Sequence, residues 1–192
     1  MKFKYKTQPY EHQRIALERS YDKINYAYFM EMGCGKSKVL IDNMAWLYEN
    51  KKIDTAIIVA PKGVYRNWQI SEIPAHLRDD IKHEVYVWNP NPNKGQKEHL
   101  LSGIEECGKL RILLVNVEGF ATPKVRAFVE KFVRGSTFLL AVDESTTIKN
   151  PKAKRTKALV ALGKAASFRR ILTGSPVTKS PMDLYAQCGF MD

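Results

Sequence analysis

The residues best suited to chemistry form a short glycine-rich segment, Gly33–Ser37 (GCGKS), placed between an apolar run and a helical pattern. A phosphate group needs a ring of backbone N–H groups, which glycines allow by letting the chain curl closely, and a helix N-terminus adds partial positive charge. Lys36 has the reach to contact β- and γ-phosphates, and the Ser37 hydroxyl can hold Mg²⁺. We predict that ATP is bound by Gly33, Cys34, Gly35, Lys36 and Ser37. The alternative is a glycine-rich turn that opens an ordinary helix.

The acidic pair Asp143-Glu144 is the second candidate, because it directly follows the apolar run Phe138–Val142. An aspartate at the tip of a buried strand is well placed to hold Mg²⁺, and the next side chain points in another direction. Glu144 can then act as the general base that polarises the attacking water. By itself the pair equally fits a loop with two solvated acids. Together with the phosphate loop it predicts catalytic roles for Lys36, Asp143 and Glu144, with Ser37 and Asp143 as the metal ligands.

Both candidates need a scaffold that brings separate loops together. Short apolar runs recur at Tyr26–Met30, Ala56–Ala60, Val85–Trp88, Ile112–Val115, Phe138–Val142 and Arg170–Thr173. Several are continuous, as in strands that are buried on both faces, and helical patterns such as Lys36–Glu49 and Val125–Phe132 lie between them. This alternation predicts an α/β fold with a mostly parallel sheet and helices on both faces, whose ligands bind at the carboxyl ends of the strands. Asn89–Gln96 is expected to be a surface loop.

The overall composition favours a single globular domain with a polyanionic partner. The chain has 192 residues and 44% hydrophobic residues, and its formal net charge is +11. Nucleic acid is the leading candidate, because no basic amphipathic helix for a membrane surface stands out. The three cysteines are far apart and the N-terminus is polar, which favours a reducing, cytoplasmic setting without a signal peptide. No apolar run approaches the ~20 residues that a membrane span needs.

Basic residues gather in one further segment. Asn150-Pro151 is typical of a helix start, with Asn as the cap and Pro in the first position. Lys152, Lys154, Arg155 and Lys157 would then crowd the first turns, where cations oppose the helix dipole unless an external anion binds there. A solvated basic face is the alternative. Lys62 and Arg66 are expected to add phosphate contacts near Pro61, and Trp68 either stacks on a base or belongs to the core.

Taken in order, these segments resemble the superfamily 2 helicases, and within them the Swi/Snf-type DNA translocases. The resemblance runs over nearly the whole chain and rests on Tyr10 with Gln13, Glu31–Ser37, Ala60-Pro61 with Asn67-Trp68 and Glu72, Asp143-Glu144, Lys149–Lys152 and Thr173–Pro176. It implies that residues 1–192 form one RecA-like P-loop lobe that uses ATP and Mg²⁺ and binds nucleic acid, DNA rather than RNA. A bacterial or phage source is also expected.

The resemblance implies further roles for individual residues. Gln13 would recognise adenine, with Tyr10 near the base. Pro61, Lys62, Arg66, Lys149, Asn150, Lys152 and Ser175 would contact nucleic acid, and Thr173, Gly174 and Ser175 would couple the ATP site to it. One departure is Ser145-Thr146, which replaces the usual Ala-His after the acidic pair and leaves the γ-phosphate relay unassigned.

A second RecA-like lobe is the expected partner. In the family that lobe carries an arginine that stabilises the transferring phosphoryl group, an effect worth about 10³–10⁵ in rate. We expect the lobe to lie outside these residues and the chain by itself to hydrolyse ATP poorly. Two rival functions remain at this point: a nucleic-acid- or partner-binding module that uses ATP only as a structural ligand, and another P-loop enzyme such as a kinase.

Overall fold

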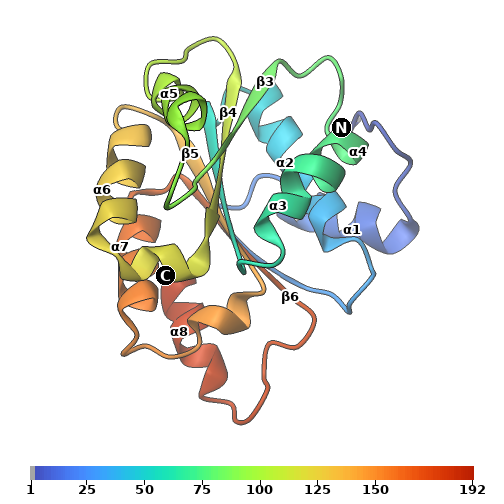
Figure 1. Ribbon diagram of the computed structural model, residues 1–192. Helices are drawn as coiled ribbons and strands as arrows, with labels where there is room; N and C mark the ends of the chain where they lie inside the picture. The colour runs from blue at the N-terminus through green and yellow to red at the C-terminus, as the bar shows by residue number, and fades with distance from the viewer. Residues whose placement is uncertain (1–2) are drawn as a thin grey trace.

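The computed structural model describes residues 3–192, which form one six-stranded sheet covered by helices (Figure 1). Every strand pair is parallel, and the strand order is β1-β6-β5-β2-β4-β3. The strands are β1 (Asn25–Phe29), β2 (Thr55–Ala60), β3 (His83–Val87), β4 (Leu110–Asn116), β5 (Phe138–Asp143) and β6 (Phe168–Thr173). The expected α/β fold with a parallel sheet is confirmed, and each predicted strand lies where its apolar run indicated.

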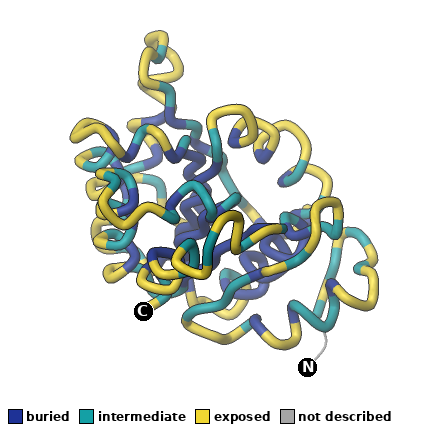
Figure 2. The backbone as a smooth tube through the Cα atoms, turned by 90° about the horizontal axis from the view of Figure 1, so that it is seen from below, coloured by how far each residue is buried: buried dark blue, intermediate teal, exposed yellow. Residues whose placement is uncertain are grey.

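Helices cover both faces of this sheet, as predicted. They are α1 (Glu11–Ser20), α2 (Lys36–Glu49), α3 (Tyr65–Asn67), α4 (Ile73–His76), α5 (Lys94–Ser102), α6 (Pro123–Phe132), α7 (Lys154–Ala165) and α8 (Asp183–Met191), with the short turns η1 (Trp68–Glu72), η2 (Val117–Ala121) and η3 (Ser145–Ile148). Because successive strand residues face opposite sides, Ile58 packs towards α1 and α2 while Ile57 packs towards α6 and α7. Figure 2 shows the buried backbone inside and exposed residues around it.

One local prediction holds only in part and another is wrong. The expected loop Asn89–Gln96 turns into α5 at Lys94, because Asn93 Oδ1 accepts a 2.8 Å hydrogen bond from the Gln96 backbone N–H and Gln96 Oε1 accepts one of 3.1 Å from the Asn93 N–H. The expected helix start at Asn150-Pro151 is a turn, and α7 begins only at Lys154. Asn150 Oδ1 accepts the Lys152 N–H at 2.9 Å, which closes this turn locally instead of capping a helix.

The strand order determines which loops meet. β1, β6, β5 and β2 are consecutive neighbours, so the segments that follow them lie side by side at one edge of the sheet. The register places Phe29 opposite Thr173 and Asp143 opposite Leu172. The phosphate loop, the Thr173 segment, the acidic pair and the Pro61 segment, which are far apart in sequence, therefore converge.

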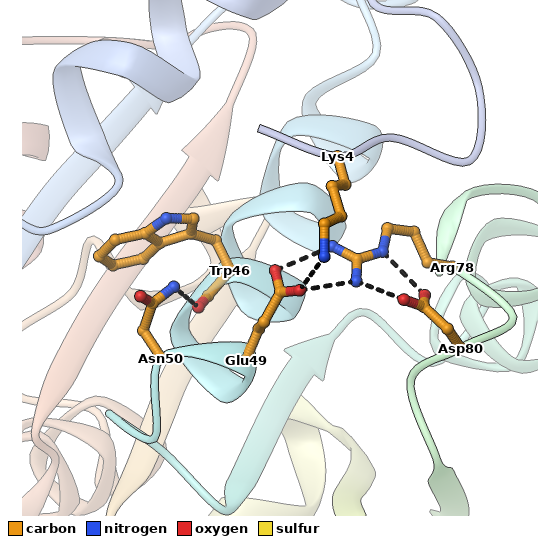
Figure 3. Close-up of polar contacts among 6 residues, drawn as sticks. All are labelled: Lys4, Trp46, Glu49, Asn50, Arg78 and Asp80. Atoms are coloured by element: carbon orange, nitrogen blue, oxygen red, sulfur yellow. Dashed lines mark hydrogen bonds and ion pairs between the residues drawn. The ribbon is translucent and has the colours of Figure 1, made fainter. Parts of the chain in front are cut away.

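Ion pairs fasten the helix that carries Lys36 to its surroundings. At the end of α2, Glu49 accepts hydrogen bonds from Arg78 at 3.0 and 3.1 Å and from Lys4 at 2.8 Å, and Arg78 also binds Asp80 (Figure 3). Arg78, and after it Lys4, lowers the pKa of Glu49 to about 2. These contacts tie the chain before α1 and after α4 to α2. No helix within residues 3–192 is both long and apolar enough to cross a bilayer.

A buried ion pair inside α2 makes the stability pH-dependent. Lys38 Nζ lies 2.7 Å from Asp42 Oδ2, and burial outweighs the effect of Lys38 and raises the pKa of Asp42 from 3.8 to about 6. The folded protein holds the Asp42 proton more tightly than the unfolded chain does. The contribution of this proton to the free energy of unfolding is therefore complete below pH 4 and is lost as the pH rises through 6. Relative to Asp42→Asn, the free energy of unfolding of the wild type should fall by about 2 kcal/mol between pH 4 and 7. Urea denaturation at each pH measures this difference, and parallel pH profiles would contradict it.

Candidate active site

The phosphate loop connects β1 to α2 through two left-handed glycines. Gly33 has φ of 80° and Gly35 has φ of 76°, a region that side chains other than glycine enter only with strain. Gly35 also has no room for a side chain, because a Cβ atom there would lie 2.3 Å from Gln13 Nε2. The glycines thus give the tight curl predicted for this loop, and it opens directly onto the N-terminus of α2 at Lys36.

Lys36 points back under the loop it belongs to. Its ammonium group donates to the backbone carbonyls of Met30 and Glu31, each at 3.1 Å, and the residue is only 9% exposed. The charge is therefore held beside the loop, where phosphate oxygens would meet it. Ser37 follows at the half-buried second position of α2.

The residues predicted to contact adenine lie against the same loop. Gln13 Nε2 donates to the Cys34 carbonyl at 3.0 Å, while Gln13 Oε1 accepts the Tyr10 N–H at 3.0 Å. His12 Nε2 makes a second contact of 3.0 Å with the Cys34 carbonyl. The Tyr10 ring is 73% exposed and stacks on the His12 ring at 6.0 Å. The Gln13 amide therefore braces the loop, and recognition of adenine by Gln13 and Tyr10 stays a prediction.

Asp143 ends β5 with its carboxylate almost entirely buried. Trp68 Nε1 donates to Oδ2 at 3.0 Å, and the Glu144 backbone N–H donates to Oδ1 at 3.0 Å. Desolvation by burial raises the pKa of Asp143, with the Glu144 charge adding to the rise, whereas Trp68 and the more distant charge of Lys36 oppose it. The carboxylate is thus held in place by two donors, with its ionised form made less favourable by burial.

Trp68 is the site residue whose role the sequence left open between base stacking and the core. It is 1% exposed, so the core alternative is confirmed, but its indole N–H also fixes the candidate metal ligand Asp143. The sequence signal that could have predicted this contact was the position of Trp68 in the chain. Trp68 follows β2, which pairs with β5, and a buried indole N–H needs an acceptor such as a carboxylate at the end of that neighbouring strand.

Glu144 adopts a strained backbone that turns the chain out of the sheet. Its φ of 48° and ψ of 61° lie in the left-handed region, which is unfavourable for a residue with a side chain. This conformation sends the Glu144 backbone N–H to the Asp143 carboxylate while the Glu144 side chain lines a cleft. Glu144 therefore leaves the strand at once, so its side chain is placed by this left-handed turn and not by alternation along β5.

The Thr173 segment packs directly on the phosphate loop. Thr173 carbonyl accepts the Met30 N–H at 3.3 Å, and Thr173 Oγ1 accepts the Ser175 N–H at 3.2 Å. A Cβ atom on Gly174 would lie 3.2 Å from the Met32 backbone N, so a side chain there would force the two backbones apart by a few tenths of an ångström. A shift of the Thr173 segment would therefore displace the phosphate loop, and the reverse, as a coupling role requires.

These elements enclose a polar cleft of about 610 Å³. It is lined by Glu31, Met32, Glu144, Thr146, Thr173, Gly174, Ser175 and Thr178. A larger and more apolar hollow of about 880 Å³ lies between α7 and α8, away from the phosphate loop. Of the residues predicted to act on ATP, Glu144 lines the polar cleft next to the Thr173 segment, whereas Gly33–Ser37 and Asp143 are not among its lining residues. No arginine is among the described residues that line it.

The residues predicted to contact nucleic acid differ in exposure and in whether they already bind other side chains. Lys62, Arg66, Asn150, Lys152 and Ser175 are exposed, and Pro61 is half-buried. Lys149 is engaged within the protein: its Nζ donates to Thr178 Oγ1 at 2.5 Å and lies 3.6 Å from Asp183. The structure brings Pro61, Lys62 and Arg66 to the end of β2 and Ser175 to the end of β6, with β5 between these two strands. Contact of this edge with nucleic acid stays a prediction.

Comparison with known proteins gives matches over almost the whole chain. The family model described as SNF2-related domain matches residues 17–191. A probable ATP-dependent DNA helicase of Arabidopsis thaliana is 29% identical over 162 residues, which are 84% of this chain and 14% of that protein. The human helicase-like transcription factor is 26% identical over 163 residues, 81% of this chain and 15% of that protein.

A solved structure gives the same fold. The Sulfolobus solfataricus SWI2/SNF2 ATPase core in complex with dsDNA superimposes with a TM-score of 0.73 at 17% sequence identity, covering 99% of this chain and 37% of that one. The expected RecA-like fold is confirmed by this match. The chain spans only about a seventh of the length of the two sequence relatives.

Proposed function

The chain belongs to the SNF2-related domain family, and from this premise we propose that it is the ATP-binding lobe of a DNA translocase that couples ATP hydrolysis to movement along DNA. The observation that carries the proposal is the meeting of the phosphate loop, the acidic pair and the Thr173 segment on the neighbouring strands β1, β5 and β6. Ligand sites of open parallel sheets lie at such carboxyl ends. The polar cleft between these loops is the proposed place of the ATP phosphates.

The donor set at this edge suits Mg²⁺. Ser37 offers a hydroxyl and Asp143 a carboxylate, and hard oxygen donors of this kind, completed by phosphate oxygens and water, are what Mg²⁺ prefers. The bound ion would neutralise charge on the phosphates during transfer. Trp68 keeps one Asp143 oxygen in a fixed direction, which leaves Oδ1 to the Glu144 N–H and the metal.

Different groups of the protein would bind the phosphates, orient the water and transmit the state of the site. Backbone N–H groups of Gly33–Gly35 and the Lys36 ammonium hold the phosphates, and Glu144 takes up a proton from the water that it orients. Gly174, in contact with the loop backbone, passes the state of the site to the exposed Ser175. Because no described residue lining the cleft is an arginine, we propose that a second RecA-like lobe supplies one.

The DNA-binding side of the proposal is tested by removing the exposed cations near the site. The triple variant Lys62→Ala, Arg66→Ala, Lys152→Ala should weaken duplex DNA binding and reduce the log–log salt slope by up to about 0.9 per lost phosphate contact. Fluorescence anisotropy between low and high salt measures both quantities. Its matched control removes equal charge far from the cleft, with Lys94→Ala, Lys97→Ala and Lys131→Ala. Equal weakening in both triples would mean that net charge, not this edge, attracts DNA.

Removing the indole donor should weaken the metal site. In Trp68→Phe, Asp143 Oδ2 loses its hydrogen bond, so the pKa of Asp143 rises further and its ionised form becomes harder to reach. A hydrogen bond to a charged group is worth about 1.5–3 kcal/mol, so we expect the Mg²⁺ concentration needed for half-maximal ATP binding to rise roughly 10- to 150-fold. Titration with Mg²⁺ at saturating ATP measures this, with Trp88→Phe as the control indole. An unchanged Mg²⁺ midpoint would remove Trp68 from the site.

A further inference from the structure

A single buried glutamine joins two loops of the cleft. Ser145, which directly follows the acidic pair, donates its hydroxyl to Gln187 Oε1 at 2.6 Å. The other end of the same amide, Gln187 Nε2, donates to the Pro176 carbonyl at 2.9 Å and to the Asp183 carbonyl of its own helix at 2.8 Å. Pro176 follows the Thr173 segment. Gln187 on α8 therefore connects the acidic motif to the loop after β6.

Burial makes the loss of any hydrogen bond in this connection costly. Ser145 and Gln187 are both 0% exposed, so water cannot replace a lost partner. Both halves of the amide are used, and an amide left unpaired in this position would be strongly unfavourable. If Ser145 shifts, the amide must follow it and pull on Pro176, or one of these bonds must break. The bridge thus behaves as a rigid tie between the two loops.

Few other polar contacts can replace the tie. Within residues 3–192, and apart from the β5–β6 ladder, no side-chain hydrogen bond runs directly from Asp143–Thr146 to Thr173–Pro176. A second link lies outside, where Lys149 Nζ donates to Thr178 Oγ1 at 2.5 Å, but that contact is exposed to solvent and to salt.

We propose that Gln187 is a positioning residue that transmits the state of the ATP site at Asp143-Glu144 to the Thr173–Pro176 segment and from there to DNA. The proposal rests on the proposed function and deepens it, because it names the residue that links the two loops. The exposed Ser175 would contact DNA with the geometry that the Ser145–Gln187–Pro176 bridge sets. Breaking the bridge should leave ATP and DNA binding in place but uncouple them.

The test compares DNA affinity with and without a non-hydrolysable ATP analogue and Mg²⁺, using the full 192-residue chain. In the wild type this ratio should depart from one by about fivefold or more. Gln187→Met keeps the side-chain length without hydrogen bonding, and Ser145→Ala removes only the hydroxyl. Each should bring the ratio close to one, and the double variant should add nothing further, since both remove the same tie. Cys188→Ala, an exposed neighbour on α8, is the matched control.

Each outcome has a separate meaning. ATP affinity should stay near the wild-type value in Ser145→Ala and Gln187→Met, and amide exchange of Ser175–Thr178 should speed up in both. A departure from one that both variants keep at the wild-type value would overturn the role of Gln187, whereas a wild-type ratio of one with the analogue bound would contradict the ATP–DNA coupling of the proposed function itself. Failure of the wild type to bind ATP with Mg²⁺ would instead contradict the proposed function. Ser145→Ala keeps the test decisive if Gln187→Met does not fold.

Discussion

Replacing Lys36 with alanine is expected to abolish measurable ATP binding while DNA binding without nucleotide persists. Lys36 sits 9% exposed beneath the loop, with its ammonium group 3.1 Å from two loop carbonyls, and phosphate oxygens would be far better partners for it. Hydrogen bonds to charged groups contribute about 1.5–3 kcal/mol each, so losing two phosphate contacts should weaken ATP binding roughly 10²–10⁴-fold. Isothermal titration with ATP and Mg²⁺ measures this loss.

The matched control for this change is Lys97→Ala, which removes the same charge from the exposed surface of α5. It should bind ATP like the wild type. DNA-stimulated ATPase activity, measured on the same variants, separates the proposed motor lobe from its rivals. A motor lobe loses this activity in Lys36→Ala, a binding module keeps its partner, and a kinase would transfer phosphate to a small molecule. Undiminished ATP affinity in Lys36→Ala would place the nucleotide elsewhere.

Replacing Glu144 with glutamine should stop hydrolysis but spare ATP binding. Glutamine keeps the size of the side chain in the same left-handed turn and cannot take up a proton from water. Because the Glu144 charge helps to raise the pKa of Asp143, its removal should also ease ionisation of that neighbouring carboxylate. We expect the single-turnover rate with excess protein and duplex DNA to fall about 10²–10⁴-fold. Hand-quenched time courses with labelled ATP measure that rate, because hydrolysis by the chain alone is expected to be slow.

Glu31→Gln provides the control, because Glu31 lines the same cleft and its change removes the same charge. This variant should hydrolyse ATP at nearly the wild-type rate. A similar loss in both variants would mean that the negative charge of the cleft matters, and not a base at Glu144. Multiple turnover by the wild-type 192 residues alone should be slow, because in the proposed function the arginine that stabilises the transferring phosphoryl group belongs to a second lobe. Fast turnover would remove the need for a second lobe.

The strands and the main motifs were predictable because they depend on local signals. Continuous apolar runs such as Phe138–Val142 lie in strands buried on both faces, and glycines at Gly33 and Gly35 take the left-handed conformations that only glycine adopts easily. Position after a strand then placed the acidic pair at the sheet edge. Local signals also misled, since Asn150-Pro151 has the composition of a helix start but closes a turn through Lys152.

The contacts that tune the site were not predictable, because each joins residues distant in the chain. Trp68 reaches Asp143 across 75 positions, and Ser145 reaches Gln187 across 42. Which side chains meet depends on strand order and helix packing, and neither can be read from local periodicity. Gln13 illustrates the same limit. Its residue type suits adenine, yet its place beside Gly35 commits the amide to the Cys34 carbonyl.

The most direct test of the central claim is the affinity of the wild-type chain for duplex DNA in two nucleotide states. Anisotropy titrations without nucleotide and with a non-hydrolysable ATP analogue plus Mg²⁺ should give dissociation constants that differ about fivefold or more. The difference should vanish in Lys36→Ala, since the analogue then no longer binds at the loop. The same dissociation constant in both states, with the analogue shown to be bound, would contradict a lobe that couples ATP to DNA.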